Sequence, residues 1–374
     1  MRVALLAVWA VIVTGGIMQT ANALQTDLLG VRADLENFPA WSIGVLMAGY
    51  YVGYSAGPLV SPFIIRNIGH ARTAIAALVL SALVIVVHGI FVSPWAWTVL
   101  RAVSGLGLAI TFVAIESWIN ERADNRVRGR VFGVYLVSQM IGMTGAQLLL
   151  QIGSPRTLLL FVLSAVIFVI AAVPLFIARD NAPERVPPEP FGIVHLYRLS
   201  PLGAIACMLS GVSWAILFTF GPVYVQRVGL GVSGVGLFMG LGLASGSLAQ
   251  FPLGWLSDAI GRKTTIAIMC AGGTMASVLG VLAGNDALLI YIVSVLAGAL
   301  IYPLYGLAVA LVNDAASPAS RVPAAAGLVL LFGIGSIFGP LAVGWAVGAF
   351  GPPAFFGVLA IVMASSLAAA LATR

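Results

Sequence analysis

Long apolar runs, each close to the length of a membrane-crossing helix, dominate this chain of 374 residues. A helix needs about 20 apolar residues to cross the hydrocarbon core of a bilayer. Polar, proline and glycine positions divide the sequence into about twelve such runs, near residues 3–26, 41–65, 73–92, 95–119, 131–152, 156–178, 200–225, 233–257, 263–283, 287–311, 322–348 and 352–373. Only 8% of the residues are charged, which excludes a soluble protein, because a soluble domain has roughly 25%. We therefore predict an all-helical integral membrane protein, since a helix satisfies its own backbone hydrogen bonds in lipid.

One long polar segment separates the first six runs from the last six. It extends from Arg179 to Ser200 and contains several prolines and charges of both signs, so it does not belong in lipid. We predict two six-helix bundles, at residues 1–178 and 200–374, joined by a cytoplasmic linker at 179–199.

The two halves resemble each other at an offset of 192–193 residues. Segment 66–70 aligns with 258–262, 120–121 aligns with 313–314, and Gly142 aligns with Gly335. Because each half has an even number of runs, the repeats share one orientation, and their axis follows the membrane normal. Such a repeat predicts a solute site near the bilayer midplane, between two halves that rock around it.

The positions of the 18 Lys and Arg residues predict the orientation of the chain. If both termini are cytoplasmic, fourteen basic residues lie on the cytoplasmic side, three lie on the other side, and Arg101 lies within a run. Cytoplasmic loops carry the excess of basic residues, so we expect both termini in the cytoplasm and the protein in a bacterial inner membrane. The first run also resembles a signal peptide, with a small-residue box at 21–23, but we expect it to stay as an uncleaved helix.

Several classes of function lack the residues that they need. The basic residues form no continuous face, so nucleic acid is not an expected partner. The sequence contains no nucleotide-binding loop, no metal-ligand cluster and no nucleophile with a base, so we expect neither an enzyme nor a cofactor or metal. Cys207 and Cys270 lie in apolar runs and are interpreted as small buried side chains.

The loop after the eighth run has a recognisable pattern. Its sequence, GWLSDAIGRK from Gly254 to Lys263, resembles the signature loop of the major facilitator superfamily of transporters. The resemblance implies a twelve-helix transporter fold and a latch formed by Gly254, Asp258, Gly261, Arg262 and Lys263. We interpret Gly254 as a site of close helix contact, Gly261 as a tight turn and Asp258 as a hydrogen-bond acceptor.

The corresponding loop of the first half keeps only part of this pattern. Arg66, Gly69 and Arg72 are candidate gating residues, but Arg66 replaces the acid and His70 replaces the arginine. We therefore expect a weaker latch in this half, and we expect His70 to face solvent.

The fourth run contains two ionisable candidates. Arg101 begins the sequence RAVSGLGLA, which resembles a second superfamily motif. Two interpretations of Arg101 stay open, an anion or proton-relay partner in a cavity and a side chain that snorkels to the outer interface.

Glu116 lies about one turn inside the cytoplasmic end of this run, and Asn120 shares its helix face. The sequence around them resembles a poorly characterised bacterial subgroup of the superfamily. We favour a role for Glu116 in an ion pair that gates the cytoplasmic side, and its candidate partners are Arg66, Arg72 and Arg130. The alternatives are that Glu116 carries a proton or contacts the solute directly.

Polar and aromatic residues of several runs are candidates for lining a solute cavity. Gln19, Asn22 and Thr26 share one helix face, and the other candidates are Gln139, Trp214, Gln250, Tyr302 and Tyr305. Interhelical hydrogen bonds or packing without a ligand are the alternatives. We interpret His88 as a satisfied helix residue, and the outer-loop acids as solvated or capping groups: Asp27, Asp34 and Glu36.

These observations predict a monomeric secondary transporter that moves a small polar or anionic solute by alternating access. Proton coupling is a hypothesis, because Arg101 and Glu116 are the only ionisable residues placed clearly within runs. Drug efflux is an alternative, although a lipophilic cation would need a buried carboxylate near the midplane, and none is evident. A lipid flippase and a non-transporting membrane receptor are the alternatives from other classes.

Overall fold

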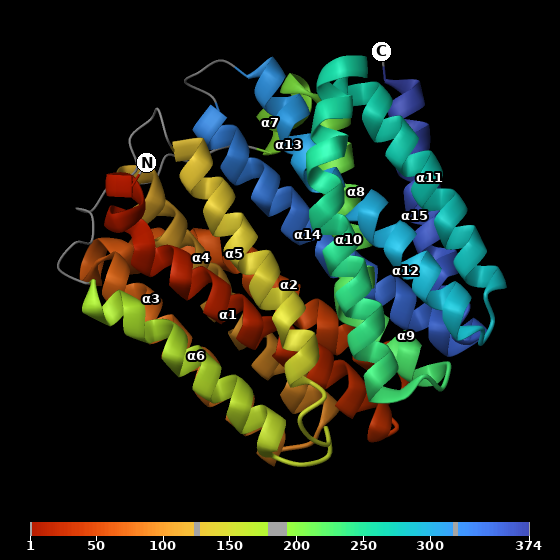
Figure 1. Ribbon diagram of the computed structural model, residues 1–374, viewed down its shortest axis with the longest axis horizontal. Helices are drawn as coiled ribbons and strands as arrows, with labels where there is room; N and C mark the ends of the chain where they lie inside the picture. The colour runs from red at the N-terminus through yellow and green to blue at the C-terminus, as the bar shows by residue number, and fades with distance from the viewer. Residues whose placement is uncertain (1, 123–127, 179–192, 317–320, 374) are drawn as a thin grey trace. The chain divides into compact units, whose positions relative to one another are not determined.

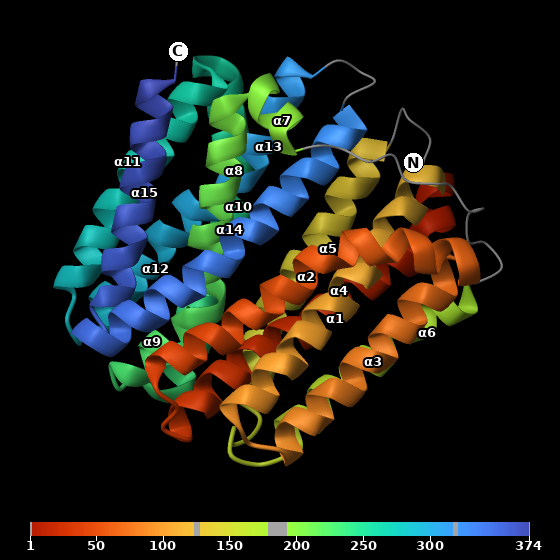
Figure 2. The same ribbon diagram turned by 180° about the vertical axis from the view of Figure 1, so that it is seen from behind.

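The computed structural model describes residues 2–122, 128–178, 193–316 and 321–373, and the regular secondary structure in these ranges is entirely helical. This confirms the predicted helical class. The helices, shown in Figures 1 and 2, are α1 (Arg2–Leu35), α2 (Ala40–Ile68), α3 (His70–Ile90), α4 (Pro94–Arg122), α5 (Arg128–Leu149), α6 (Leu159–Ile177), α7 (Ile193–Leu199), α8 (Pro201–Ala215), η2 (Ile216–Phe220), α9 (Gly221–Arg227), α10 (Gly231–Ile260), α11 (Arg262–Leu282), α12 (Ala287–Ile301), α13 (Leu304–Ala315), α14 (Arg321–Phe350) and α15 (Ala354–Ala372).

Eleven helical segments among the described residues are long and apolar enough to cross a membrane. Two of them are interrupted, because Pro201–Arg227 comprises α8, η2 and α9, and Ala287–Ala315 comprises α12 and α13. Helix α1 has 34 residues but is not among the eleven. The predicted total of about twelve spans therefore stays a prediction.

Proline accounts for both interruptions. A proline has no N–H to donate to the preceding turn, and its ring clashes with that turn. Pro222 follows the π-helical turn η2 within two residues, and Pro303 separates α12 from α13.

The chain divides into two compact units. The first unit contains Met1–Arg32 and Val52–Pro188, and the second contains Ala33–Tyr51 and Glu189–Arg374. The division therefore falls inside the continuous helices α1 and α2. The predicted domains at 1–178 and 200–374 stay a prediction, and most of the predicted linker at 179–199 lies outside the described residues.

Corresponding helix pairs occur in both units. Helix α3 packs against α6 in the first unit, and α11 packs against α15 in the second, as Figures 1 and 2 show. A methyl group added to Gly142 would clash with the carbonyl oxygen of Gly16, and one added to Gly335 would clash with that of Met208. The two contacts are related by the offset of 192–193 residues, which supports the predicted internal repeat.

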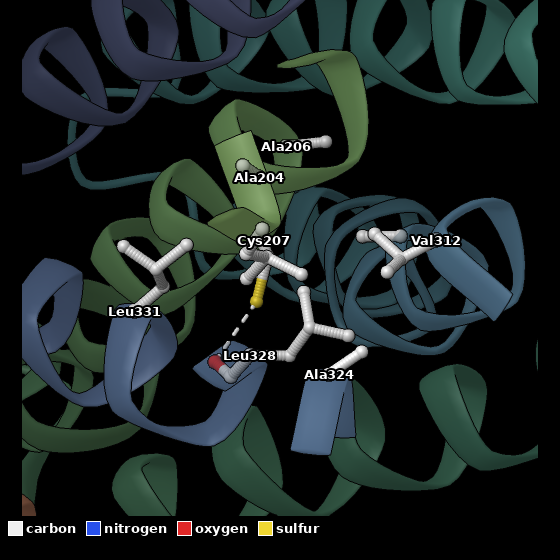
Figure 3. Packing of buried hydrophobic residues seen from close by; sticks show 9 residues of the cluster. Ala204, Ala206, Cys207, Val312, Ala324, Leu328 and Leu331 are labelled. Atoms are coloured by element: carbon white, nitrogen blue, oxygen red, sulfur yellow. Dashed lines mark hydrogen bonds between the residues drawn. The ribbon is translucent and has the colours of Figure 1, made fainter. Parts of the chain in front are cut away.

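Small apolar side chains form part of the core of the second unit (Figure 3). Cys207 of α8 is fully buried there, and its Sγ donates a hydrogen bond to the carbonyl oxygen of Leu328 on α14 at 3.2 Å. Cys270 is also fully buried, and neither cysteine forms a disulfide. Both are small buried side chains, as predicted.

Candidate functional site

Arg101 of α4 is fully buried in the first unit. Its Nη2 donates a hydrogen bond to Oγ1 of Thr26 on α1 over 3.4 Å. The guanidinium group therefore points into the protein and does not reach the outer interface. The snorkelling interpretation is wrong, because the side chain finds a polar partner on a neighbouring helix.

Asp27 lies beside Thr26 and is also fully buried. Its Oδ2 accepts a hydrogen bond from Nε2 of Gln147 on α5 at 2.7 Å, and the positive charge of Arg101 acts on it. The prediction that Asp27 is a solvated or capping group of an outer loop is wrong, because α1 continues to Leu35. A buried carboxylate therefore exists within a helix, contrary to the sequence interpretation.

His88 of α3 is another buried ionisable residue near Arg101. It is fully buried, its Nδ1 lies 2.8 Å from the carbonyl oxygen of Val84, and its ring centroid is 5.8 Å from that of Trp97. Arg101 acts on it electrostatically. Nδ1 is satisfied within its own helix, as predicted, but Nε2 has no hydrogen-bond partner among the described residues.

We call Thr26, Asp27, His88, Arg101 and Gln147 the Arg101 cluster. Buried ionisable groups inside a membrane protein are costly and mark functional sites. Within the described part of the chain, Oδ1 of Asp27 and Oε1 of Gln147 lack hydrogen-bond partners. Two buried acceptors without donors form a place where a proton or a donor group of a solute would be stabilised.

The other polar residues of α1 are occupied by hydrogen bonds. Nδ2 of Asn22 donates to Oε1 of Gln19 at 3.2 Å, and Nε2 of Gln19 lies 3.5 Å from Sδ of Met143. Nε2 of Gln25, which the sequence analysis did not select, donates to Oγ of Ser104 on α4 at 3.0 Å. Gln19 and Thr26 thus make the interhelical contacts that were the alternative to cavity lining, whereas Asn22 bonds within α1. Lining by Gln19, Asn22 and Thr26 stays a prediction.

Glu116 of α4 is half-buried and lies beside the hydroxyl group of Tyr135 on α5. Gln139, another predicted cavity residue, is buried one turn farther along α5 and also faces Tyr135. In the part of the chain that the structure describes, Glu116 forms no ion pair with Arg66 or Arg72, and both arginines are exposed.

The guanidinium group of Arg66 lies over the ring of Phe63, 5.6 Å from its centroid. The side chains of Asn120 and Arg130 lie outside the described residues. The gate role of Glu116 therefore stays a prediction, with Arg130 as its partner still to be tested.

The signature loop of the second unit forms an ion-pair network. Arg262 contacts Oδ1 of Asp258 at 2.7 Å, Oδ2 of Asp314 at 3.2 Å and Oγ of Ser257 at 2.9 Å. Gly261 has a φ of 93°, which is the tight turn that the sequence predicts.

Two further residues of this loop behave differently. The ammonium group of Lys263 donates to the carbonyl oxygen of Thr373, beyond α15. Gly254 has open space around it in the described structure, because an added methyl group would meet no atom within 4 Å. The interpretation of Gly254 as a site of close helix contact is therefore wrong.

The corresponding loop of the first unit contains the equivalent pair. His70 Nε2 lies 3.6 Å from Oε1 of Glu121, and these residues align with Arg262 and Asp314 at the repeat offset. His70 is 2% exposed, so the prediction that it faces solvent is wrong, because the side chain turns inward to Glu121. Burial raises the pKa of Glu121, and the charge of Arg122 partly opposes this. Gly69 has a φ of 84° and makes the matching turn.

Three of the predicted cavity residues in the second unit are aromatic and lie close together, whereas Gln250 lies apart from them. The ring of Trp214 lies 4.6 Å from that of Tyr302, and Phe332 joins Trp214 to Tyr305, at 6.2 Å and 4.9 Å respectively. Gln250 is exposed. Aromatic packing was the alternative to solute contact, so solute contact stays a prediction.

Comparisons of the sequence with known proteins indicate one family. The sequence profile of the Major Facilitator Superfamily matches residues 3–286 and 229–374. The chain is 26% identical over 332 residues to the uncharacterized MFS-type transporter YcaD of Escherichia fergusonii, covering 87% of this chain and 84% of the relative. It is 29% identical, with the same coverage, to an uncharacterized MFS-type transporter of Enterobacter sp. strain 638.

Two solved structures share the fold. The nucleoside transporter NupG gives a TM-score of 0.79 at 15% identity and covers 98% of both chains. A bacterial homolog of the human lysosomal transporter Spinster gives 0.75 at 15% identity, over 98% of this chain and 94% of the other. The resemblance, including that to a poorly characterised bacterial subgroup, is confirmed. The chain is thus a multi-pass membrane transporter that belongs to the major facilitator superfamily.

Proposed function

We propose that the protein is a secondary active transporter that moves a small polar or anionic solute by alternating access and couples this movement to protons. The observation that carries the proposal is the Arg101 cluster. In this cluster the carboxyl group of Asp27 lies within the electrostatic influence of Arg101, whose positive charge is fixed. Both residues are fully buried and lie on helices of a transporter fold.

Charge balance links the proton to the solute. When Asp27 is ionised, its charge compensates that of Arg101, and the buried cluster is close to neutral. When Asp27 takes up a proton, the charge of Arg101 is left uncompensated, and an anionic group of a solute restores neutrality. Since an uncompensated charge inside a bilayer is costly, proton and anion should bind together and be released together. This scheme predicts symport.

One observation favours drug efflux as a second candidate. Oδ1 of Asp27 is a buried carboxylate oxygen without a hydrogen-bond partner among the described residues, and a lipophilic cation would need such a group. A cation beside Arg101 would give the cluster a net positive charge, however, and Coulomb repulsion grows at low dielectric. We therefore favour the polar or anionic solute.

The test begins with purified protein in a thermal-shift screen against nucleosides, organic anions and lipophilic cations. Uptake of the compound that stabilises the protein most is then measured in proteoliposomes, with and without an imposed pH gradient. We expect a pH gradient to accelerate uptake and Asp27→Asn to reduce this acceleration at least about tenfold, which corresponds to roughly 1.4 kcal/mol.

Asp286→Asn is the matched control. Asp286 caps α12 by accepting a hydrogen bond from the Leu289 backbone N–H, and asparagine is an equally good cap. This variant should transport like the unmodified protein. Full gradient-driven uptake by Asp27→Asn would contradict the proposed coupling, and a loss confined to Glu116→Gln would move the proton site to Glu116.

We also propose that both termini lie in the cytoplasm, that the protein resides in a bacterial inner membrane, and that it acts as a monomer. The distribution of Lys and Arg supports the orientation. Each half of the repeat contributes one side of a central site in this scheme, so a single chain suffices.

A further inference from the structure

Five aromatic side chains of the second unit meet at the two places where its helices are interrupted. The ring centroid of Trp214, at the end of α8, lies 6.3 Å from that of Phe218 in the π-helical turn η2 and 4.6 Å from that of Tyr302. Phe332 of α14 joins Trp214 to Tyr305, which follows the break between α12 and α13. We call Trp214, Phe218, Tyr302, Tyr305 and Phe332 the aromatic cluster. π-helical turns are frequent at functional sites, and interrupted helices form the solute sites of many transporters.

The aromatic cluster lies at the depth where a transporter is expected to bind its solute. Trp214 is close to the middle of the span Pro201–Arg227, and Tyr302 is close to the middle of Ala287–Ala315. Tryptophan and tyrosine side chains that anchor a protein in a bilayer lie instead at its two interfaces. Trp345, which is exposed near the end of α14, has the position of such an anchor. Anchoring at an interface therefore does not account for the aromatic cluster.

The described helices α8 to α15 carry no charged residue in their interior. Their charged residues lie within two residues of a helix end: Arg227, Asp258, Arg262, Lys263, Asp314 and Arg321. Arg227 forms an ion pair with Asp34 at 2.7 Å, so the prediction that Asp34 is a solvated or capping group is wrong. Because the surroundings of the aromatic cluster are neutral, the part of a solute that contacts it is uncharged.

Two rings of the aromatic cluster are fixed by the surrounding helices. Phe218 and Tyr302 are 3% and 6% exposed. The ring of Tyr302 packs directly on α10, because a methyl group added to Gly246 would clash with it. These two rings hold their neighbours in place before a solute arrives, and such preorganisation lowers the cost of binding.

The other three rings are partly exposed: Trp214, Tyr305 and Phe332. The last two pack on the core of small side chains around Cys207 (Figure 3). Trp214 meets Tyr302 and Phe332 edge to face, with interplanar angles of 69° and 67°. An additional aromatic ring can join such an arrangement through edge-to-face or offset-stacked contacts, which a saturated ring of similar size cannot make.

A second group of aromatic residues in this unit is completely enclosed. The ring of Tyr224 stacks on that of Phe355 at 4.8 Å, with Phe356 at 5.1 Å and Phe238 at 6.2 Å. None of these four residues is more than 2% exposed. Packing therefore accounts for this group, whereas the aromatic cluster keeps three rings partly accessible.

We propose that the aromatic cluster binds a planar ring of the solute, and that the transported compound is an aromatic organic anion such as an aromatic carboxylate. This inference rests on the proposed function, which supplies the anionic group. The ring contributes binding free energy through contacts with Trp214, Tyr305 and Phe332. Since these side chains are neutral, they discriminate between solutes by the shape and aromaticity of the ring and not by its charge.

The test compares carboxylates whose rings differ in aromaticity. Benzoate, phenylacetate and 2-naphthoate are paired with cyclohexanecarboxylate, cyclohexylacetate and decahydronaphthalene-2-carboxylate. The dissociation constant of each compound is measured with the complete purified protein, and its uptake is measured in proteoliposomes with and without a pH gradient. We expect at least one aromatic carboxylate to bind at least about fivefold more tightly than its saturated partner.

Substitutions of tryptophan make the expectation specific. Trp214→Leu should bring the ratio of the two dissociation constants close to one, whereas Trp214→Phe, which keeps an aromatic ring, should preserve most of the preference. Trp345→Leu is the matched control, because it makes the same change on an exposed tryptophan outside the aromatic cluster, and it should leave the ratio unchanged. A ratio taken within one variant is insensitive to a general loss of affinity. If Trp214→Leu does not fold, Tyr305→Leu replaces it.

The possible results separate this inference from the proposed function. Equal binding of aromatic and saturated carboxylates would overturn the inference, as would a full preference in both Trp214→Leu and Tyr305→Leu. The absence of binding by all three aromatic carboxylates would also overturn it, whether or not another anion is transported. If benzamide binds as tightly as benzoate, and uptake of the aromatic compounds ignores the pH gradient while their ring preference persists, the proposed function fails and the aromatic ring site stands.

Discussion

Gln147 donates a hydrogen bond to the fully buried carboxylate of Asp27. The contribution of this bond to stability can therefore be predicted. Gln147→Leu removes the only bond to Asp27 Oδ2 that the described residues provide and leaves a buried carboxylate without a donor. Such a loss costs about 1–3 kcal/mol. We expect Gln147→Leu to lower the free energy of unfolding by this amount, measured by reversible denaturation in mixed micelles.

A double-mutant cycle separates this bond from simple packing. In an Asp27→Asn background the partner of Gln147 is neutral, and hydrogen bonds to neutral groups are about half as strong as those to ions. Gln147→Leu should therefore cost clearly less there. Equal costs in the two backgrounds would mean that Gln147 acts by filling space.

Glu121 allows a pH prediction, because it lies just beyond the span Pro94–Ile119. Burial raises its pKa above the ordinary value of 4.5, against the opposing charge of Arg122. The folded protein therefore holds this proton more tightly than the unfolded chain does. Stability from this group is complete at pH values below 4.5 and is lost as the pH rises through the raised pKa.

Glu121→Gln carries no such proton and provides the comparison. The melting temperature of Glu121→Gln minus that of the unmodified protein should increase as the pH rises from about 4 to about 7, and then level off. His70 competes with this effect, because its protonated ring would stabilise the ionised carboxylate at 3.6 Å. If the difference instead decreases with pH, the His70 ion pair outweighs burial, and the double variant with His70→Gln should remove the trend.

Three residues lie elsewhere than predicted, and they share one physical cause. Asp27, Asp34 and His70 are polar, and a hydropathy pattern assigns such residues to loops or solvent. The structure pairs each of them with a residue of another helix that is distant in sequence, and it buries Asp27 and His70 almost completely. Leu28, Leu29 and Val31 continue the apolar pattern beyond Asp27 and were the available sign that α1 extends farther.

At the scale of helices, glycine positions decide which pairs come close. Gly142 and Gly145 both lie on α5. A methyl group added to Gly142 would clash with the carbonyl oxygen of Gly16, whereas one added to Gly145 would meet open space within the described structure. Gly142→Ala should destabilise the protein by about 1–3 kcal/mol, as overpacking does. Gly145→Ala should be neutral or stabilising by up to about 1 kcal/mol, because alanine favours helix.

Thermal unfolding of the two variants in the same detergent checks this prediction. The order of stability should be Gly145→Ala at or above the unmodified protein, and Gly142→Ala below it. The equivalent variant in the second unit, Gly335→Ala, should behave like Gly142→Ala, since it clashes with the Met208 carbonyl oxygen. If Gly142→Ala is as stable as the unmodified protein, α1 and α5 are less tightly packed than in the structure.

The positions of the helices could be predicted from the sequence more closely than their interruptions. The predicted run 287–311 corresponds to Ala287–Ala315, and 233–257 corresponds to Gly231–Ile260. Apolar length alone sets these limits. The π-helical turn at Ile216–Phe220 and the break at Pro303 were not predicted, because an apolar run continues through both and only the prolines mark them.

At the scale of the whole chain, the repeat was predictable and the division into units was not. The offset of 192–193 residues relates the pair His70–Glu121 to the pair Arg262–Asp314. The same offset relates the close helix contact at Gly142 to the one at Gly335. Duplicated sequence keeps such contacts even when their chemistry changes. Residues 33–51 belong to the second unit, where Asp34 contacts Arg227 and Gly44 contacts Gly344. These partners are far away in sequence, so no local pattern reveals the division.

The orientation of the whole molecule follows from its basic residues and can be tested by labelling intact cells. In a background with alanine at 207 and 270, an impermeant maleimide should react with Asn285→Cys and Pro39→Cys before the cells are opened. Asn67→Cys, at the end of α2, should react only afterwards. All three positions are exposed in the structure, so a difference in reactivity reports the side of the membrane rather than burial. If Asn67→Cys reacts in intact cells, the proposed orientation is wrong. The signature loop with Arg262 would then lie outside the cell together with most of the basic residues, which is contrary to the usual excess of basic residues in cytoplasmic loops.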